Sequence, residues 1–498
     1  MPLNNLREFI ALLEKHQQLL RISTPLSAEL EITEVTGRVS KLPAGQNKAL
    51  LFEHVSGRGS QPTQEYGLPV LINAFGSAQR MALALEVEQL NQLSERLGRL
   101  IDPRLPRGMG QAISRGRDML GALRGIGLQP KKVRSAPVQE VVETTTPSLD
   151  FLPVLKCWPK DGGRFITLPQ VITRNPQTGV RNVGMYRLQV VDDRTLIVHW
   201  QRHKGGADHE QRARALQKTR IPAAIVLGGD PASMWCASAP LPPEIDEYLL
   251  AGYLRGAPVP FINCVSQPLE VPAEAEIVIE GFVDLSDYRD EGPFGDHTGY
   301  YTPIERFPAF HVTAVTHRRD PIYPATVVGI PPMEDMWMGK ATERLFLPLI
   351  RMVIPEVLDI NMPAEGVFHN LVIASVQKRF PGHARKVMHG LWGLGLLTLA
   401  KAIVVVDEWV DAQDLSQVAW QVLGNVDWSR DLLIDQGPVD QLDHASYTAL
   451  YGGKIGIDAT AKLPEEGYLR GWPEVARMSP EVKEKIDQII KELGVEKP

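Results

Sequence analysis

The sequence has few cysteines, no block of basic residues and no long apolar run, and each absence excludes a class of protein. Three cysteines occur among the 498 residues, with no C-x-x-C pair, which argues against a disulfide framework and a cysteine-based zinc site. The formal net charge is −6, so the chain lacks the excess of basic residues that is typical of nucleic-acid-binding proteins. The most apolar segment, 390–406, is interrupted by Lys401 and is shorter than the roughly 20 residues that a membrane span needs. We therefore expect a protein of a reducing, cytoplasmic compartment that does not bind nucleic acid.

Common nucleotide and hydrolase signatures are also missing. There is no G-x-x-x-x-G-K-[ST], because YGGKIG at 451–456 lacks the hydroxyl residue that should follow the lysine. G-x-G-x-x-G between a strand and a helix, H-E-x-x-H, G-x-S-x-G and the kinase motifs do not occur. The usual ATP, NAD and hydrolase chemistries therefore do not explain this chain.

The length predicts two to four domains, and the texture of the sequence changes twice. Residues 1–136 begin with an amphipathic helix and end in an Arg/Gly/Pro-rich helical connector over 94–136; the apolar face of the first helix is expected to hold Leu6, Phe9, Ile10, Leu13 and Leu20. Residues 137–325 alternate short β-branched or aromatic runs with turns, which predicts a β barrel or sandwich that includes a hairpin over 183–201.

Residues 326–498 alternate strands with helices, which favours an α/β domain with a parallel sheet. We expect strands at 371–376, 402–408 and 431–435, and helices at 384–401 and 414–424. A final helix should begin at Ser479 and stop at Gly494. Its apolar stripe is expected to pack within the chain, with a neighbouring subunit as the alternative; the stripe is Val482, Ile486, Ile489, Ile490 and Leu493.

The stretch EGPFGDHTGYY (291–301) places Glu291 and Asp296 five positions apart on a backbone that cannot be helical. A rigid Gly-Pro-Phe-Gly link can aim both carboxylates at one point, where their pKa values would be pushed apart and one acid would stay protonated near neutral pH. A protonated acid beside an arginine can deliver a proton to carbon. Taken alone, the stretch also fits a surface turn with solvated acids.

Three further stretches carry polar residues in the same β-rich region. Asn182 and Arg187 can serve one site only if Gly184 bends the strand or Asn182 precedes it. HKGG (203–206) offers backbone N–H groups beside a cation, which suits a phosphate. Asn182, His203 and Glu247 would form a mixed O/N/O set suited to Mn²⁺ or Mg²⁺. The alternatives are a surface arginine, an ordinary turn and ordinary acids at a helix start.

Together these stretches resemble the UbiD family of decarboxylases, whose namesake is the 3-polyprenyl-4-hydroxybenzoate carboxy-lyase of ubiquinone biosynthesis. The resemblance runs along nearly the whole chain in one order: NLREFIALLEKHQQLLRI, LPVLKCWPKDGGRFIT, NVGMYRLQV, HWQRHKGG, GGDPAS, EYLLAGYLRG, EGPFGDHTGYY, FPGHARKVMHGLWG and GGKIGIDAT.

The resemblance implies a central split β-barrel flavin-binding domain (137–325), flanked by an N-terminal α/β domain (1–136) and a C-terminal α/β domain (326–498). It implies prenylated FMN as cofactor, with Mn²⁺ (or Mg²⁺) and often K⁺ near the phosphate. The metal ligands would be Asn182, His203 and Glu247. The catalytic set would be Arg187, Glu291 and Asp296. Cofactor contacts would come from Met185, Tyr186, Arg187, His199, Trp200, Gln201, Lys204 and Gly205. Lys204 stands where the family often has arginine; lysine keeps the charge but cannot make the paired hydrogen bonds of a guanidinium. Asp296 is glutamate in some relatives.

The implied activity is non-oxidative, reversible decarboxylation of an aromatic acid, with prenylated FMN as electron sink and the Glu-Arg-Asp set moving the proton. Among relatives' substrates, the quinone-pathway acids fit best: polyprenyl-4-hydroxybenzoate or a dihydroxynaphthoate of ubiquinone or menaquinone biosynthesis. The expected partners are a flavin prenyltransferase that supplies the cofactor and further copies of the chain, as dimers or hexamers. A prenylated substrate would add transient contact with the inner membrane surface. The alternatives are an FMN oxidoreductase on a split barrel and a non-catalytic flavin- or metal-binding protein.

Overall fold

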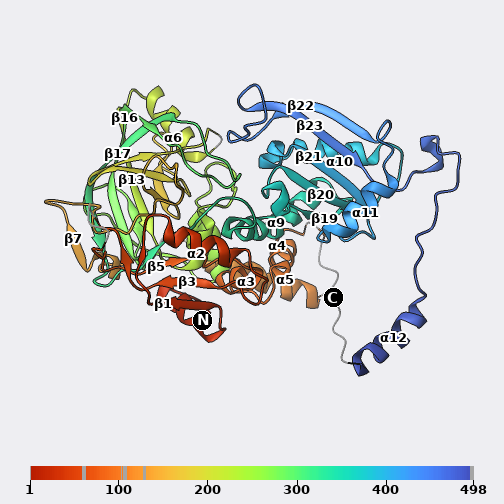
Figure 1. Ribbon diagram of the computed structural model, residues 1–498, viewed down its shortest axis with the longest axis horizontal. Helices are drawn as coiled ribbons and strands as arrows, with labels where there is room; N and C mark the ends of the chain where they lie inside the picture. Colours follow the sequence, from red (N-terminus) through yellow and green to blue (C-terminus); the bar gives the residue numbers. More distant parts are fainter. Residues whose placement is uncertain are drawn as a thin grey trace.

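The computed structural model describes residues 2–58, 63–102, 104, 109–126, 131–202 and 204–493. Figure 1 shows two lobes: the N-terminal and central segments build one, and residues 357–458 build the other. Helix α9 (Glu334–Val353) lies where the lobes meet. The chain is therefore a multidomain α/β protein.

The N-terminal sheet is completed by a strand from much later in the chain. Its order is β1-β3-β5-β18, and β18 (Tyr323–Pro324) follows the whole central segment. The other members are β1 (Leu19–Ile22), β3 (Ala49–Phe52) and β5 (Val70–Ile72), and a separate pair is formed by β2 (Leu26–Ser27) and β4 (Val55–Ser56). The helices here are α1 (Leu6–Lys15), α2 (Glu31–Ser40), α3 (Ala78–Ala84), α4 (Asn91–Ile101) and α5 (Met109–Ile126).

Helix α1 forms as predicted at its start and ends earlier than expected. The Glu8 N–H donates to Asn5 Oδ1 at 3.0 Å, so Asn5 caps the first turn. Four of the five predicted face residues are buried; Leu20 instead lies in β1, where it is 48% exposed. The helix stops because Gln17 takes a positive φ of 55°, which turns the chain into the strand.

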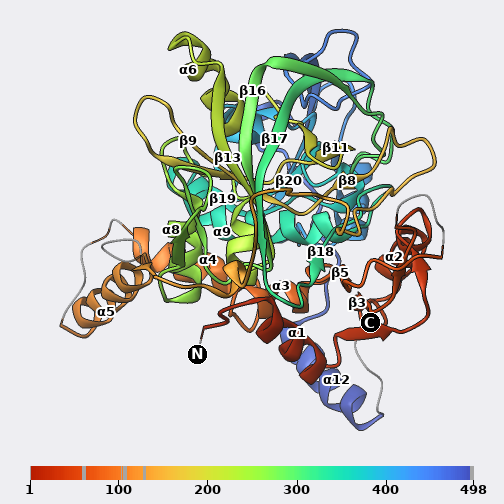
Figure 2. The same ribbon diagram turned by 90° about the vertical axis from the view of Figure 1, so that its left-hand side faces the viewer.

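The central segment forms one large antiparallel sheet. In the described part of the chain its order is β10-β9-β13-β16-β17-β12-β11-β8, with β7 also pairing β17. Figure 2 shows β16 and β17 as long neighbours through its middle. The members are β7 (Val141–Glu143), β8 (Phe165–Ile166), β9 (Gln170–Arg174), β10 (Arg181–Gly184), β11 (Leu188–Asp192), β12 (Thr195–Val198), β13 (Arg220–Leu227), β16 (Ile277–Glu291) and β17 (Glu305–His317).

Within the described residues the two ends of this sheet, β10 and β8, do not pair, so no closed barrel forms. The predicted β-rich texture is present, and β11 and β12 form the predicted hairpin. Around the sheet lie β6 (Lys131–Lys132), α6 (Gly205–Ala215), α7 (Pro231–Cys236), α8 (Glu247–Arg255), β14 (Pro260–Asn263) and β15 (Glu270–Pro272).

The C-terminal sheet is mixed rather than purely parallel. Its order is β19-β20-β21-β23-β22, in which β20, β21 and β23 run parallel and the two edge strands run antiparallel. Each edge strand is joined to its antiparallel neighbour, over residues 362–370 and 439–450, without the crossover α-helix that a parallel pair usually needs. The strands are β19 (Val357–Asn361), β20 (Leu371–Val376), β21 (Ala402–Asp407), β22 (Leu432–Pro438) and β23 (Tyr451–Asp458).

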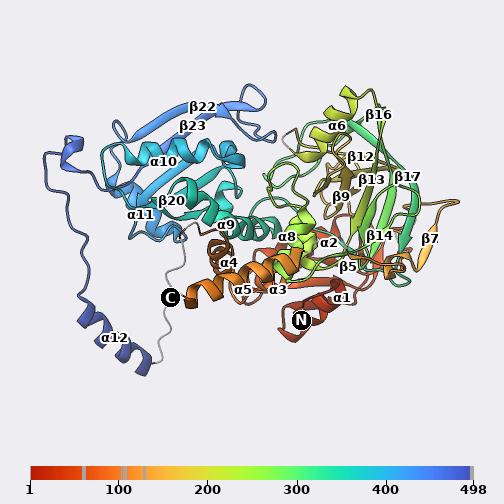
Figure 3. The same cartoon turned by 180° about the vertical axis from the view of Figure 1, so that it is seen from behind.

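Helices α10 (His383–Trp392) and α11 (Leu415–Asn425) pack on this sheet, as seen from behind in Figure 3. Helix α11 matches its prediction, whereas α10 is shorter than the predicted helix over 384–401. Gly395 takes a positive φ of 51° and opens a short 3₁₀ turn that feeds β21. No helix among the described residues is long and apolar enough to cross a membrane.

The final helix, α12 (Pro480–Glu492), stands away from both lobes at the end of an irregular stretch (Figure 1). The expectation that its stripe packs within the chain is wrong: Val482, Ile486, Ile489 and Leu493 are 39–67% exposed. The predicted stop at Gly494 lies outside the described residues.

Candidate active site

A guanidinium held between two buried carboxylates is the centre of the site. Arg187 lies in the break between β10 and β11; its Nε donates to Glu291 Oε1 at 2.7 Å and its Nη2 to Glu291 Oε2 at 3.0 Å. Its Nη1 donates to Asp296 Oδ2. The three side chains are 9%, 1% and 9% exposed respectively. Residues more than one hundred positions apart therefore form one compact ionic set.

The backbone bends at Gly184, as one of the two sequence alternatives required. Strand β10 ends there, and residues 185–187 belong to no strand. A Cβ on Gly184 would lie 2.1 Å from the Tyr186 ring, so this close approach needs glycine. Because of the break, Asn182 and Arg187 are not forced to opposite faces, as they would be on an unbroken strand.

The loop carrying the acids is held along its length by hydrogen bonds. The Gly292 N–H donates to Gln189 Oε1 at 2.7 Å, and the Gly295 N–H donates to Asp161 Oδ1 at 2.8 Å. Gly292 has a φ of +97° and is joined to Pro293 by a cis peptide bond. A Cβ on Gly295 would lie 2.2 Å from the ring of Trp158. These contacts fix where Glu291 and Asp296 point.

Both acids are held ionised, which corrects the expectation that one would be protonated. Burial would raise the pKa of Glu291, but hydrogen bonds from His199 and Arg187 outweigh it and lower this pKa to about 2. Burial is likewise outweighed at Asp296, where the charges of His297 and Arg187 hold the pKa below its ordinary value. The two acids do not share a proton, because the Arg187 guanidinium donates to each of them directly and stabilises both negative charges.

His199 completes this end of the site. Its Nδ1 lies 3.1 Å from Glu291 Oε2 and 3.0 Å from Arg187 Nη2, so its tautomer decides which contact is the hydrogen bond. Its Nε2 is buried and has no hydrogen-bond partner among the described residues, and the same holds for Trp200 Nε1. Buried polar atoms of this kind normally have a partner.

A second cluster surrounds the start of α6. The Gly206 N–H donates to the Tyr186 hydroxyl at 3.0 Å, and Glu247 Oε2 accepts from the Val183 N–H at 2.7 Å. A Cβ on Gly205 would lie 1.9 Å from Asn182 Oδ1, so glycine allows the helix to approach this side chain. Burial raises the pKa of Glu247 to about 7. The structure thus brings Asn182, Tyr186, Gly205 and Glu247 together.

The other predicted residues of this cluster are placed as follows. Lys204 is the residue before α6; burial lowers its pKa, and the charges of Asp440 and Glu247 oppose that effect. The Met185 N–H donates to the Ala237 carbonyl at 2.8 Å, and the Gln201 carbonyl accepts from Lys204 N at 3.0 Å. His203 lies outside the described residues. Among the residues that are described, no three His, Cys, Asp or Glu side chains gather as a metal site. That search does not reach the predicted set, because Asn182 is of another type and His203 is not described.

The sequence did not point to several residues that shape the site. Asp161, Gln189 and Thr302 anchor the acid loop, and His297 hydrogen-bonds Asp296 through Nδ1 at 2.7 Å. Asp161 and His297 lie inside quoted family stretches, so closer reading of those stretches could have found them. His369 and Asp440 come from the other lobe, and no local signal connects them to this loop.

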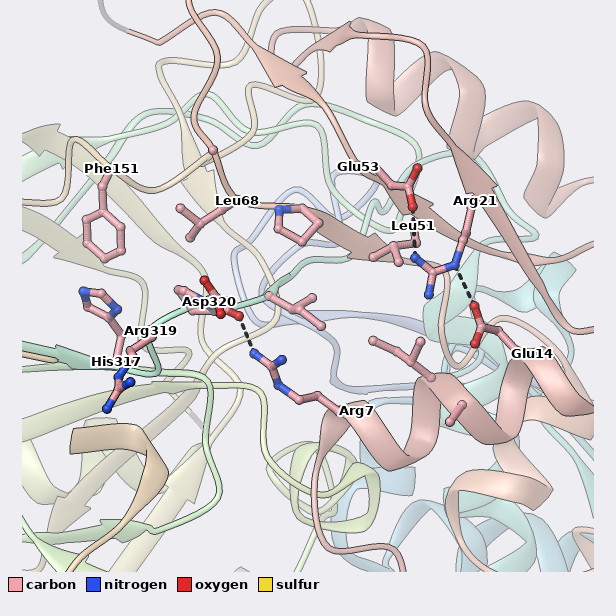
Figure 4. A pocket seen from close by; sticks show the side chains of 16 residues that line it. Arg7, Glu14, Arg21, Leu51, Glu53, Leu68, Phe151, His317, Arg319 and Asp320 are labelled. Carbon is pink, nitrogen blue, oxygen red and sulfur yellow. Dashed lines mark hydrogen bonds and ion pairs between the residues drawn. The ribbon is translucent and has the colours of Figure 1, made fainter. Parts of the chain in front are cut away.

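A separate pocket, drawn in Figure 4, contains none of the predicted site residues. It lies where α1 and β1 meet the segment after β17. Its arginines are mostly satisfied: Arg7 donates to the Asp320 carbonyl, and Arg21 pairs with Glu14 and Glu53.

Comparison with known proteins identifies the family. Three sequence profiles match in order: the N-terminal domain (10–100), the Rift-related domain (131–331) and the C-terminal domain of 3-octaprenyl-4-hydroxybenzoate carboxy-lyase (336–459). The chain therefore belongs to the UbiD family, whose members are carboxy-lyases. An uncharacterised protein of Aquifex aeolicus is 51% identical over 493 residues, 99% of each chain.

Solved structures agree over nearly the whole chain. Vanillic acid decarboxylase of Sedimentibacter hydroxybenzoicus, in its closed form, is 27% identical with a TM-score of 0.84, covering 98% of this chain and 99% of that one. The UbiD-class enzyme HmfF of Pelotomaculum thermopropionicum, in complex with FMN, is 27% identical with a TM-score of 0.79, covering 96% and 98%. An evolved dimeric form of HmfF, solved with prenylated FMN, is 26% identical with a TM-score of 0.77, covering 96% and 98%.

Proposed function

We propose that this protein removes CO₂ from an aromatic acid, reversibly and without oxidation, at the Arg187–Glu291–Asp296 set with prenylated FMN bound beside it. The observation that carries the proposal is the guanidinium shared by two buried carboxylates on a backbone fixed by hydrogen bonds. Such an arrangement can orient a substrate carboxylate and move a proton at a defined position. Membership of a carboxy-lyase family supports the same reaction.

The residues fit the cofactor. Two buried atoms, His199 Nε2 and Trp200 Nε1, have no partner in the described part of the chain and suit a polar ligand. We infer that Met185, Tyr186, Arg187, His199, Trp200, Gln201, Lys204 and Gly205 hold the flavin, on a central sheet (137–325) that acts as a split barrel between domains 1–136 and 326–498. When bound, prenylated FMN supplies the electron sink that no side chain offers.

The cluster at the start of α6 fits the phosphate and its metal ion. Asn182, His203 and Glu247 would bind Mn²⁺ or Mg²⁺, since oxygen donors and one imidazole suit these ions. Lys204 and the first N–H groups of α6 would face the phosphate, and K⁺ would complete the charge balance. The absence of a Cβ at Gly205 supports this role, because it keeps Asn182 and the helix start in contact.

The acids must gain a proton during turnover although both are ionised at rest. A substrate carboxylate would compete for the guanidinium donors of Arg187. Each donor that turns to the substrate weakens the stabilisation of the acid that it leaves and raises the pKa of that acid. Glu291 or Asp296 could then carry the proton that replaces CO₂ on carbon.

For the substrate we infer a quinone-pathway acid, either polyprenyl-4-hydroxybenzoate or a dihydroxynaphthoate. A prenyl tail would need an apolar channel and would bring the protein to a membrane surface. Two apolar groups could line such a channel: residues 390–400, and a cluster made of Met333, Met336, Trp337 and Met338. Leu391 and Trp392 of the first group are buried beneath the C-terminal sheet. In the second, Met333 and Met338 are 3% and 5% exposed, and Met336 and Trp337 are half-buried. This packing favours the smaller naphthoate.

The exposed stripe of α12 supports a homo-oligomer. A helix of 13 residues is marginal in isolation, so its apolar face gains most by packing on another copy of the chain. A dimer or hexamer whose subunits separate when residues 479–498 are deleted would agree with this role.

The test is co-production with a flavin prenyltransferase, which we infer to be the source of the cofactor. Mass spectrometry of the released ligand should give prenylated FMN, and hydroxybenzoate and dihydroxynaphthoate acids should then be screened for CO₂ release. NAD(P)H oxidation without CO₂ release would indicate a flavin oxidoreductase instead. Bound flavin with no turnover on any acid would contradict the proposal.

A further inference from the structure

Two histidines connect the acid loop to the C-terminal lobe. His297 follows Asp296, and both its backbone N–H and its Nδ1 lie within hydrogen-bond distance of Asp296 Oδ1, at 2.6 and 2.7 Å. Its Nε2 lies 3.0 Å from Nε2 of His369, which precedes β20 in the other lobe. The side chain of His297 is 15% exposed. Asp296 is thus held by Arg187 on one oxygen and by this histidine chain on the other.

We propose that His297 and His369 are positioning residues, through which the C-terminal lobe holds Asp296 in line with Arg187. The alignment of Asp296 then depends on the docking of the two lobes. The kinetic consequence rests on the proposed decarboxylase function, whereas the link itself does not.

The surroundings of His297 define its charge. It faces Asp296 on its own loop, Asp335 at the start of α9, and His369 and Asp440 from the C-terminal lobe. Burial opposes its charge, but the carboxylate and hydrogen bond of Asp296 outweigh burial and raise the pKa of His297. Burial, aided by the charge of His297, lowers the pKa of His369 to about 4. A protonated His297 thus donates from both nitrogens, and a neutral His369 accepts.

Other contacts show that the lobes meet around this loop. The ring of Tyr300 lies 4.2 Å from that of His444, and Gln441 Nε2 donates to Glu305 Oε2 at 3.3 Å. The Phe368 ring stacks on His297 at 5.3 Å with an interplanar angle of 28°. Figure 1 shows the loop between β22 and β23 reaching from the C-terminal lobe towards the central sheet. The histidine pair is the contact that ends on a carboxylate of the candidate site.

Histidine NMR of the whole chain tests the link directly. With ¹³C-labelled histidine, His369→Leu should lower the titration midpoint of His297 by about 0.5–1 unit, because an acceptor of its charged N–H is lost. His369→Gln can place an amide oxygen near the position of Nε2, so it should restore the midpoint. His16→Gln, at an exposed histidine of α1's end, is the matched control and should change nothing. An unchanged His297 midpoint in folded His369→Leu would overturn the proposal.

A second variant tests the same link if His369→Leu does not fold. In His297→Asn the amide nitrogen can still donate to Asp296 but cannot reach His369. The pKa of His369 should then rise above its native value of about 4 and stay below its ordinary 6.5, since the charge of His297 is gone but burial, the larger cause, remains. A pKa of His369 equal to that of the native chain would contradict the link.

Kinetic measurements distinguish a positioning role of His369 from a purely packing role. In cofactor-loaded protein, His369→Leu should reduce kcat about tenfold or more with KM within about threefold, and His369→Gln should recover most of kcat. Equal losses in both variants would count against positioning. If the native chain releases CO₂ from no acid, the proposed function fails, and the NMR midpoints still decide whether the link exists.

Discussion

Replacing Arg187 with methionine should destabilise the central segment, because it leaves two buried carboxylates without their shared cation. The pKa of Glu291 lies about 2.5 units below its ordinary 4.5, because the bonds from His199 and Arg187 together outweigh burial; at about 1.4 kcal/mol per unit the whole shift corresponds to about 3 kcal/mol, which His199 and Arg187 share. Removing one partner of a buried ion pair typically costs a similar amount, about 3–5 kcal/mol. Such a loss should lower the apparent Tm of a unit of this size by roughly 6–12 °C.

The effect should depend on pH in a defined direction. In the native chain the pKa of Glu291 is lowered, so its stabilisation is complete above about pH 4.5 and is lost as the pH falls towards about 2. Without the guanidinium, burial should raise the pKa of Glu291, and the resulting penalty is full at high pH and fades on acidification. The Tm difference should therefore be largest near neutral pH and narrow towards pH 4.5.

Scanning fluorimetry across this pH range is a sufficient assay. Arg306→Met is the matched control, because Arg306 is 68% exposed, its contact with Asp290 spans 3.9 Å, and its bond to the Tyr288 carbonyl at 2.6 Å is exposed to solvent. A Tm for Arg187→Met that stays within about 2 °C of the control at neutral pH, well short of the shift calculated above, would refute the reasoning.

Three further outcomes follow from the same geometry. Arg187→Lys keeps the charge but loses the paired hydrogen bonds of the guanidinium, so kcat should fall about 100-fold or more while flavin stays bound, measured as CO₂ release and flavin absorbance. A near-native kcat would contradict a role for the paired hydrogen bonds. Gly205→Ala would place a Cβ 1.9 Å from Asn182 Oδ1, so it should lower the Mn²⁺ content of the purified protein in metal analysis. Gly453→Ala is the control, because its Cβ would meet no atom within 4 Å. Equal metal content in the two variants would count against the site. Asp161→Asn keeps the shape but weakens the bonds to Gly295 and Trp158, so it should lower the Tm by a few degrees and reduce kcat, and an unchanged kcat would show that the loop needs no anchor.

Much of the fold could be predicted, because local patterns determine it. Strand β20 matches its predicted range, and α11 differs by one residue at its ends, since both have clear periodicity and flanking turns. Predictions failed where tertiary contacts decide. Helix α10 ends at Trp392, before the end of the apolar run that periodicity alone would continue, and β18 joins an N-terminal sheet that no local pattern connects to it.

The candidate site could also be predicted only in part. Glu291 and Asp296 could be paired from one rigid loop, and their meeting with Arg187 came from resemblance rather than spacing. Their ionisation was predicted incorrectly, because the sequence shows two acids close together but not how many guanidinium bonds each receives. His369 and Asp440 could not be found from sequence, since their place beside the loop depends on how two lobes pack.

The most direct test of the central assignment is CO₂ release by cofactor-loaded Glu291→Gln beside the native chain, at matched flavin content. We predict that the native protein decarboxylates an aromatic acid and that the variant retains its flavin but loses turnover. Near-native turnover in Glu291→Gln would contradict the proton path through Arg187, Glu291 and Asp296.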